Sequence, residues 1–457
     1  MTQKIHARHV LTPEGWARDR TVKIGRDGRI AELASGAPDA DTLCTDLLLP
    51  APVNLHSHSF QRALAGLTEA RGPDPSDSFW TWRTLMYRFL DQLTPDQVEA
   101  IAALAFMEML EAGFGAVAEF HYLHHAPGGA PYDALPEMAT RIVAAADRAG
   151  LGLTLLPVLY MQGGCDGRAL AGGQRRFGCD LDQYDRLLSG SRAALRHAPD
   201  DAALGVAPHS LRAVAPDSLA RVPDLCPGAP LHMHLAEQVA EVEEVRTALG
   251  ARPVEWVLQN MDPGPDWCFI HCTQMTGAET AALAATGAVA GLCPITEASL
   301  GDGIFNAVAF AAAGGRFGVG SDSNIHISLL AELSALDYSQ RLRDHTRAAL
   351  ATPDRSTGRV LYDAALAAGA QAAGRASGAL APGHWADLVA IDTGTPALCA
   401  RQGDTLLDSL IFSGQGQSSL TDVWSAGRHV VREGRHVARD TITRRYTETL
   451  SALSTAL

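Results

Sequence analysis

The sequence predicts an α/β fold, a TIM-like (β/α)8 barrel with a small antiparallel β domain formed by the N- and C-terminal segments. Two observations predict the barrel: short apolar runs alternate with helical stretches eight times between residues 48 and 322, and the runs are apolar throughout. Parallel strands that are buried on both faces have this near-continuous apolar character. The third observation concerns the chain ends, where apolar and polar residues alternate around turn signals, as in half-exposed antiparallel strands.

Composition limits the class of protein and its partners. The 457 residues are 47% hydrophobic and 19% charged, as in ordinary globular proteins, and the formal net charge is -14. This acidic balance disfavours contact with nucleic acid or with an anionic membrane, so we expect a small-molecule partner. Eight scattered cysteines without a C-x-x-C pair, and an N-terminus without an apolar signal segment, predict a cytoplasmic protein without disulfide bonds.

The two ends of the chain are predicted to form one small β domain. Residues 1–47 alternate in polarity, and the R-D-G-R sequence at 26–29 is typical of a hairpin turn. Residues 376–457 repeat this character at 384–392 and 421–437. We therefore expect the N- and C-terminal segments to flank the barrel and to share a sheet.

The central segment, residues 48–375, is predicted to be the barrel. Its helices can be located from their end signals: Thr94 as N-cap, Pro95 at the first helical position and Gly113 at the end delimit one helix. The predicted strands lie in the runs 48–58, 115–122, 151–160, 203–210, 230–237, 267–272, 287–294 and 316–322.

In a (β/α)8 barrel the catalytic groups lie at the C-terminal ends of the strands. Four of the eight runs end in histidine, which occurs only 17 times in the chain, although any single polar residue there can simply lead into a solvated loop. The strand-end residues are His56 and His58, Glu119 with His121 and Tyr122, Tyr160, His209, His234 with Glu237, His271, Thr296 with Glu297, and Asp322.

The H-S-H sequence at 56–58 predicts a metal site. Residues two apart on a strand point to the same side, so both imidazoles can bind one ion at about 2.0–2.1 Å. His234 and Asp322 end other strands and can complete the site, although the H-M-H sequence at 232–234 has the same form and one of its histidines can be structural. Three neutral imidazoles and one carboxylate would leave a divalent cation with a charge of about +1, enough to acidify a bound water toward a pKa of ~7.

Glu237 and His271 are predicted to handle protons. Glu237 follows His234 by three residues, so the chain has turned toward the next helix and the carboxylate can lie above the metal. His271 ends the sixth run and can hold or deprotonate a water molecule. Each can instead be a surface acid or a buried structural histidine. Lys4 and Lys23 are the only lysines, which disfavours Schiff-base and carbamylated-lysine chemistry.

The motifs H-S-H, H-L-A-E, I-H-C and G-S-D, in this order in a β/α barrel with a split antiparallel domain, resemble the amidohydrolase superfamily. The likeness covers nearly the whole chain. Members with two metals generally use a bridging lysine on the fourth strand, where this sequence has His209, so the resemblance is to the mononuclear deaminase branch. Within that branch, the stretches NLHSHSFQRALAG, HLAEQ, CPITEASLGDGIF and GSDSNIHISLLAELSALDYSQRLR resemble the N-formimino-L-glutamate deiminase family of histidine degradation.

That resemblance implies a function and a set of site residues. It implies hydrolysis of N-formimino-L-glutamate to N-formyl-L-glutamate and ammonia, one divalent metal, namely zinc, and a homodimer. The implied zinc ligands are His56, His58, His234 and Asp322, the implied catalytic residues are Glu237, His271 and Asp322, and the implied substrate contacts are Gln61, Arg83, Tyr122, His209 and Arg212.

The residues also support an anionic amidine substrate independently of the resemblance. Arg83 follows the first strand and Arg212 lies just beyond the fourth, so two guanidinium groups are expected near the barrel mouth. Arginine suits carboxylates because its planar fork donates two parallel hydrogen bonds, although either arginine can instead be a solvated surface residue. We expect His271 and Asp322 to orient and deprotonate the water. Glu237 would then pass a proton to the departing nitrogen.

Two other functions fit part of the sequence. A nucleobase or triazine aminohydrolase, such as a guanine- or adenosine-type deaminase, shares the fold, the metal site and the reaction, but a neutral ring needs stacking partners more than arginines. A barrel that binds a ligand without turnover would not need an acid–base pair beside the metal. Metal analysis together with an ammonia-release assay distinguishes the three.

Overall fold

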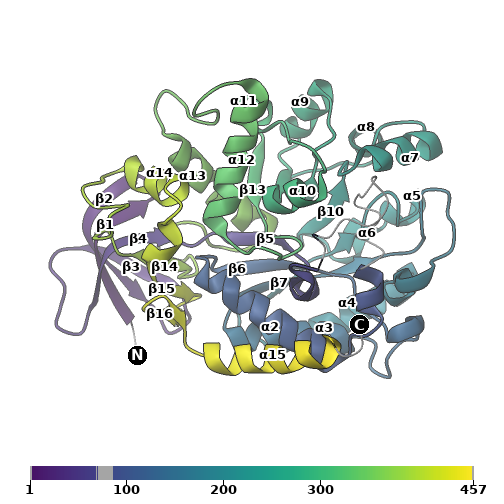
Figure 1. The fold of residues 1–457 in the computed structure, drawn as a ribbon, viewed down its shortest axis with the longest axis horizontal. Helices are drawn as coiled ribbons and strands as arrows, with labels where there is room; N and C mark the ends of the chain where they lie inside the picture. The colour runs from purple at the N-terminus through teal and green to yellow at the C-terminus, as the bar shows by residue number, and fades with distance from the viewer. Residues whose placement is uncertain (1–2, 68, 70–85, 455–457) are drawn as a thin grey trace.

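The computed structural model describes residues 3–67, 69 and 86–454, and it confirms the predicted (β/α)8 barrel (Figure 1). Its strands are parallel and follow one another in chain order. Two single bridges, Val206 with Leu231 and Ser57 with Asp322, join the two parallel sheets into a closed ring. The barrel strands are β5 (Val53–Ser57), β6 (Ala116–His121), β7 (Gly152–Leu159), β8 (Ala203–Leu204) with β9 (Ala207–Pro208), β10 (Leu231–Leu235), β11 (Trp267–His271), β12 (Val289–Leu292) and β13 (Arg316–Val319).

The fourth barrel position is interrupted between β8 and β9, although both segments pair with β7. Gly205 lies at the break, where a Cβ would come within 2.5 Å of the Leu156 side chain and 2.6 Å of the Pro230 carbonyl oxygen. A larger residue would collide with the neighbouring strands, so this close approach requires glycine. Directly after β9 the chain reaches His209.

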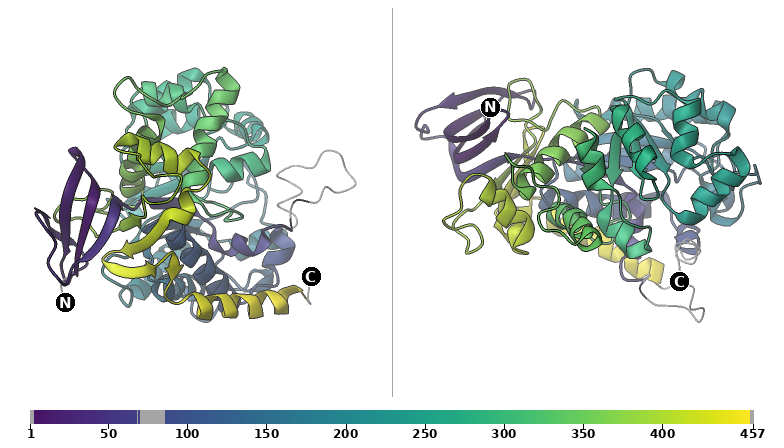
Figure 2. Two further views of the ribbon diagram at one scale, coloured as in Figure 1. Left: turned by 60° about the vertical axis from the view of Figure 1, so that its left-hand side comes forward. Right: turned by 90° about the horizontal axis from the view of Figure 1, so that it is seen from above.

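Helices cover the outside of the barrel (Figures 1 and 2). α2 (Pro95–Glu111) has the predicted ends: the Thr94 side chain accepts from the Gln97 N–H in a capping box, and Gly113 adopts a φ of 92° just beyond the helix. The other helices between strands are α3 (Glu137–Ala149), α4 (Leu181–Leu195), α5 (Pro216–Leu219), α6 (Val222–Leu225), α7 (Val239–Leu249), α8 (Pro253–Asn260), α9 (Gly277–Ala285), α10 (Pro294–Leu300), α11 (Ala307–Ala312), α12 (Leu329–Asp344) and α13 (Thr357–Ala372).

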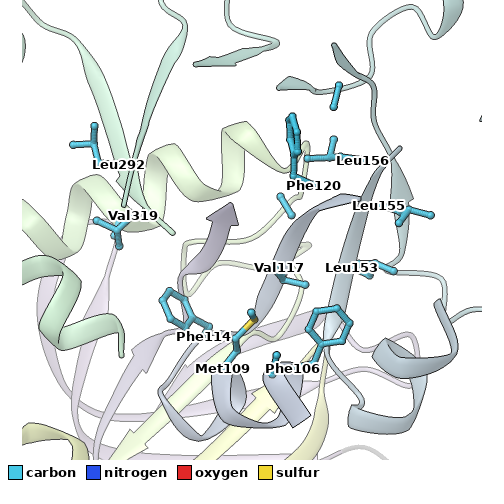
Figure 3. Packing of buried hydrophobic residues seen from close by; sticks show 14 of the residues in the cluster. Phe106, Met109, Phe114, Val117, Phe120, Leu153, Leu155, Leu156, Leu292 and Val319 are labelled. Carbon is cyan, nitrogen blue, oxygen red and sulfur yellow. The ribbon is translucent and has the colours of Figure 1, made fainter. Parts of the chain in front are cut away.

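The largest cluster of buried apolar residues lies between the barrel strands and the surrounding helices (Figure 3). Phe106 and Met109 of α2 lie close to Val117 of β6, and all three side chains are fully buried. Phe120, nearer the C-terminal end of β6, brings this core up to the predicted site, because its ring centroid lies 4.5 Å from that of His234. The predicted metal site therefore has an apolar floor.

The two chain ends form one eight-stranded sheet beside the barrel, as predicted (Figure 2). The N- and C-terminal segments join where β4 pairs with β14. One pair departs from the antiparallel prediction: β1 and β4 are parallel, because β2 folds back on one edge of β1 and residues 36–42 carry the chain to its other edge. The strands are β1 (Gln3–Thr12), β2 (Gly15–Ile24), β3 (Ile30–Ser35), β4 (Leu43–Pro50), β14 (Leu388–Ile391), β15 (Leu420–Ser425), β16 (Arg428–Arg432) and β17 (Arg435–His436).

Some segment bounds differ from the sequence pattern. The apolar run 48–58 contains the end of β4 and all of β5, so it belongs to two different sheets. The C-terminal segment also contains α14 (Asp404–Phe412) and α15 (Arg439–Ser454), and α15 turns back along α2 (Figure 1), where Arg445 donates to Glu99 at 2.5 Å. Within the described part of the chain, no helix is long and apolar enough to span a lipid bilayer.

A buried cluster of charged residues fastens the small sheet to the barrel. Arg375, which follows α13, donates to both carboxylate oxygens of Asp387 at 2.7 and 3.0 Å and to Asp201 at 2.9 Å. Arg428 of β16 donates to the same Asp201 carboxylate at 2.7 and 2.8 Å. Because Asp201 precedes β8 and Asp387 precedes β14, these bonds link the barrel to the C-terminal strands.

Candidate metal centre and active site

The C-terminal ends of the barrel strands surround a cavity. Most of the residues predicted from the sequence line it, and His56 lies in contact with them, fully buried. Arg83 lies outside the described residues. The predicted residues that line the cavity are His58, Gln61, Tyr122, His209, Arg212, His234, Glu237, His271 and Asp322.

Three imidazole nitrogens and one carboxylate oxygen converge at the base of this cavity. The Nε2 atom of His56 lies 3.2 Å from the Nε2 atoms of both His58 and His234. The Oδ1 atom of Asp322 lies 3.2 Å from His58 Nε2 and 3.6 Å from His56 Nε2. Ligand atoms at 2.0–2.1 Å around a tetrahedral zinc ion are about 3.3 Å apart, so the four donors have the spacing that such an ion requires.

The outer ring nitrogens of two of these histidines determine which nitrogen faces the centre. His58 Nδ1 lies 3.0 Å from the Phe120 carbonyl oxygen, and His234 Nδ1 lies 3.2 Å from that of His209. A carbonyl oxygen only accepts, so each Nδ1 carries the proton and each Nε2 presents its lone pair. Burial lowers the pKa of His58 to about 3 and the pKa of His234 well below its ordinary value, which keeps both rings neutral.

Asp322 is held in place by the barrel closure itself. Its backbone N–H donates to the His56 carbonyl oxygen at 3.0 Å, and its own carbonyl oxygen accepts from the His58 N–H at 2.9 Å. Asn54 reinforces this junction by accepting from the Ser321 N–H at 3.0 Å. Burial raises the pKa of Asp322 to about 7, and a cation between the donors would favour its ionised form.

His271 lies beside these donors and is surrounded by carboxylates. Its Nε2 atom is 3.7 Å from Glu237 Oε1 and 3.8 Å from Asp322 Oδ2, and its Nδ1 atom is 3.3 Å from Glu297 Oε1. Burial alone would lower the pKa of His271, but the three carboxylates outweigh it and raise that pKa to about 10. The arrangement can hold and move protons next to the metal donors.

The predicted substrate contacts lie along the walls of the cavity. Arg212 is 8% exposed, and its terminal nitrogen lies 3.5 Å from Glu237 Oε2. Gln61 donates to the Tyr122 hydroxyl at 2.7 Å. Among the described residues, neither Gln61 Oε1 nor Arg212 Nε has a hydrogen-bond partner. The His209 ring lies edge-on to that of Tyr160, with 4.6 Å between the centroids.

The sequence analysis assigned no role to several residues that shape this site. Glu297 follows the seventh run in the first turn of α10, and its contact with His271 depends on a turn that the strand pattern does not specify. Aromatic and apolar side chains also line the cavity and carry no motif that would have indicated it. They are Met86, Tyr87, Phe177 and Leu300.

Comparisons with known proteins support the resemblance seen in the sequence. The profile of the amidohydrolase family matches residues 47–430, and that of the formimidoylglutamate deiminase HutF N-terminal domain matches residues 2–41. The chain is 48% identical over 457 residues to the formimidoylglutamate deiminase of Pseudomonas aeruginosa, across 98% of this chain and 99% of that protein. It is 27% identical over 451 residues to a 5-methylthioadenosine/S-adenosylhomocysteine deaminase of Natronomonas pharaonis, across 95% of this chain and 94% of that protein.

A solved structure supports the same family assignment. The fold is similar to the crystal structure of an amidohydrolase from Brucella melitensis, with a TM-score of 0.95 and 48% sequence identity across 99% of both chains. The family profile spans most of the sequence, and the relatives at 48% identity match it over almost its full length. This chain therefore belongs to the amidohydrolase family, in its formimidoylglutamate deiminase group.

Proposed function

We propose that this chain hydrolyses N-formimino-L-glutamate to N-formyl-L-glutamate and ammonia, a deimination step of histidine degradation. The observation that carries the proposal is the buried guanidinium of Arg212 in the wall of a cavity whose base is a cluster of metal-binding groups. An amidine that bears carboxylates matches both features, because its anionic end suits the arginine and its reactive carbon suits the metal. The 48%-identical relative from Pseudomonas aeruginosa carries the corresponding name.

We assign His56, His58, His234 and Asp322 as the ligands of one divalent ion, and we propose zinc. Neutral imidazoles together with a carboxylate form a donor set that suits this ion. When bound, the ion supplies the Lewis acidity that allows water to ionise near neutral pH. A lysine-bridged second ion is not proposed, because both lysines of the chain lie on β1 and β2, in the small sheet.

The proton steps are assigned to Glu237, His271 and Asp322. Attack of a water oxygen on the formimino carbon makes that carbon tetrahedral, with two nitrogens attached, and the protonated nitrogen leaves. We propose that His271 and Asp322 orient the water and that Asp322 accepts its proton, because the carboxylates around His271 keep that ring protonated near neutral pH. We propose that Glu237 delivers a proton to the terminal nitrogen. Ammonia then departs, and the bond to the amino-acid nitrogen remains.

The distal part of the substrate is assigned to the cavity wall. Arg212 and Arg83 would bind the carboxylates, since guanidinium groups donate paired hydrogen bonds to them. Gln61 and Tyr122, already 2.7 Å apart, would add hydrogen bonds from the side of the first two strands. His209 lies next to His234 in the ring cluster, with 4.9 Å between centroids, and would contact the formimino group.

The test is ammonia release from N-formimino-L-glutamate, compared with N-formimino-L-aspartate, guanine and adenosine. Arg212→Met should lower kcat/KM for the dicarboxylate by about ten- to a hundred-fold, because a charge-assisted hydrogen bond contributes roughly 1.5–3 kcal/mol. Arg168→Met is the matched control, because Arg168 is half exposed and pairs with Asp166 outside the cavity; it should leave kcat/KM within about twofold.

The same assay tests the alternative function. A nucleobase or triazine aminohydrolase would share the metal donors and proton carriers, but Arg212 would then have no anionic partner on the substrate. Faster turnover of guanine or adenosine than of N-formimino-L-glutamate, or an unchanged kcat/KM in Arg212→Met, would refute our assignment and favour this alternative.

We also propose that the protein is a cytoplasmic homodimer. The cytoplasmic location is supported by the eight cysteines, all of which are unpaired, as expected in a reducing compartment. The formal net charge of -14 supports a small-molecule partner over nucleic acid. Light scattering on the purified full-length chain tests the dimer, and cell fractionation tests the location; a monomer or a secreted protein contradicts the respective proposal.

A further inference from the structure

The backbone of Glu237 is held by hydrogen bonds from both sides. Its N–H donates to the Oε2 atom of Glu241 at 2.9 Å, and the preceding Ala236 N–H donates to Oε1 of the same carboxylate at 3.3 Å. On the opposite side, the Thr273 hydroxyl donates to the Glu237 carbonyl oxygen at 2.6 Å. The turn that carries Glu237 is therefore fixed by two side chains, from α7 and from the segment after β11.

This turn has an unfavourable backbone conformation. Ala236 adopts a φ of +52°, in the left-handed region that side chains other than glycine rarely adopt. Such a residue persists only where its surroundings determine the conformation. The consequence for the site is direct: the turn places the Glu237 carboxylate 3.5 Å from Arg212 and 3.7 Å from His271.

Glu241 occupies the third position of α7, from which a glutamate in a capping box reaches back to the N-cap N–H. The N-cap of α7 is Gln238, whose side chain makes no capping bond, and the Glu241 carboxylate reaches beyond it to the N–H groups of Ala236 and Glu237. Glu241 is fully buried, and burying a carboxylate is costly unless it is paired or hydrogen-bonded. The bonds that compensate this cost are the ones that define the Glu237 turn.

We propose that Glu241 is a positioning residue that holds Glu237 in place for proton transfer. The inference rests on the proton-carrying role that the proposed function gives to Glu237. Glu241 does not line the cavity, and its hydrogen bonds act on the site through Glu237. Its charge also acts on Arg212 in the cavity wall, and Glu241→Gln, which removes the same charge as Glu241→Ala, controls for that effect. Displacing a reacting group by about 1 Å can cost around a hundred-fold in rate, which sets the size of the expected effect.

The chain offers a matched control in Glu279. This residue is also buried, lies in the first turn of α9 after a barrel strand, and accepts a backbone N–H, from Thr276, at 2.7 Å. Its carboxylate completes a capping box and accepts from Arg252 Nε at 3.0 Å, and Glu279 does not line the cavity. Glu279→Ala should therefore lower thermal stability in the same way as Glu241→Ala, without changing kcat.

The experiment compares kcat, KM, metal content and melting temperature of the full-length metal-loaded enzyme. Glu241→Ala should lower kcat by about ten- to a hundred-fold, with KM changed by less than about threefold and metal content unchanged. Glu241→Gln keeps one acceptor oxygen and should recover part of the lost rate. A kcat for Glu241→Ala within about twofold of that for Glu279→Ala would overturn the proposal.

The double variant separates this inference from the proposed function. Glu237→Gln alone should lower kcat by about 10²–10⁴-fold and retain the metal. Adding Glu241→Ala should lower kcat little further, because the carboxylate that Glu241 positions is already absent. Losses that multiply would show that Glu241 acts independently of Glu237 and would overturn the inference. A Glu237→Gln enzyme within a few-fold of wild type would instead refute the role assigned to Glu237.

Discussion

Burial suits the imidazoles of the proposed metal centre to bind a cation. His56 is fully buried, and this burial, together with the neighbouring histidines, lowers its pKa well below the ordinary value. A neutral ring offers a lone pair where a protonated ring would repel a cation. The ring of Phe120, whose centroid lies 5.1 Å from that of His56, contributes to this burial and so helps to keep the imidazole neutral.

Replacing His56 should abolish metal retention and activity together. His56→Ala removes the donor whose Nε2 lies 3.2 Å from the Nε2 atoms of both other imidazoles, so the remaining groups no longer surround an ion. Elemental analysis after gel filtration and ammonia release are the measurements. A variant that keeps one tightly bound ion per chain and wild-type turnover contradicts the assignment.

His232 provides the control for this prediction. It lies two residues before His234 on β10, and its Nε2 atom is 2.7 Å from the Ala372 carbonyl oxygen, nearer the N-terminal end of the strand than the metal donors. His232→Ala should lower the melting temperature, because it removes a buried side chain, and should leave the metal content unchanged.

Helix ends determine stability at the scale of single elements, and α2 is the clearest case. Thr94→Ala removes the acceptor for the Gln97 N–H and breaks the capping box, which should cost about 1 kcal/mol in the free energy of unfolding. Activity should not change, because neither Thr94 nor Gln97 lines the cavity. Urea unfolding and steady-state kinetics on the same preparation measure both quantities.

A threonine on the exposed face of α15 is the control for this element. Thr447 bonds only to the carbonyl oxygen of Thr443 within its own helix, so Thr447→Ala should leave the free energy of unfolding nearly unchanged. If Thr94→Ala also left the free energy of unfolding unchanged, the Thr94 cap would not stabilise the folded protein.

At the scale of the whole molecule, the small sheet is held to the barrel by the buried charges around Arg375. Arg375→Met leaves the carboxylates of Asp201 and Asp387 buried without their shared partner, which should cost about 3–5 kcal/mol in the free energy of unfolding. The exposed pair of Lys23 and Glu32 is the control, and Lys23→Met should have little effect. Urea titration monitored by tryptophan fluorescence compares them.

The same cluster should determine how the free energy of unfolding falls at acid pH. Burial raises the pKa of Asp201, but Arg428 and Arg375 outweigh it and hold this pKa below the ordinary value. Because the folded-state pKa is the lower one, the stabilisation is complete above the unfolded pKa of about 3.9 and is lost as the pH falls through the folded-state pKa. Asp201→Asn should therefore flatten the fall in stability below about pH 4, measured by circular dichroism; an unchanged acid transition argues against this role.

The alternation of apolar runs and helices was sufficient to predict the barrel, and residue types at strand ends were sufficient to predict which residues meet in it. Both patterns can be recognised from short stretches of sequence, because the side-chain period of a strand and the order of strands and helices depend on neighbouring residues. Strands that run parallel to one another must also bring their C-terminal ends to one rim. For this reason residues as distant in the chain as His58 and Asp322 could be expected in one cavity, whereas Gln61 was implied only by the family resemblance.

Only the tertiary structure decided which of several equivalent residues serves the site. His232 and His234 belong to one H-M-H motif, yet His232 lies beside the Ala372 carbonyl oxygen and His234 beside His56. The contact of Glu297 with His271 and the parallel pairing of β1 with β4 are equally absent from the local pattern. Each depends on the contact that one segment makes with another far along the chain, and such contacts exist only once the core has packed and fixed the direction of each side chain.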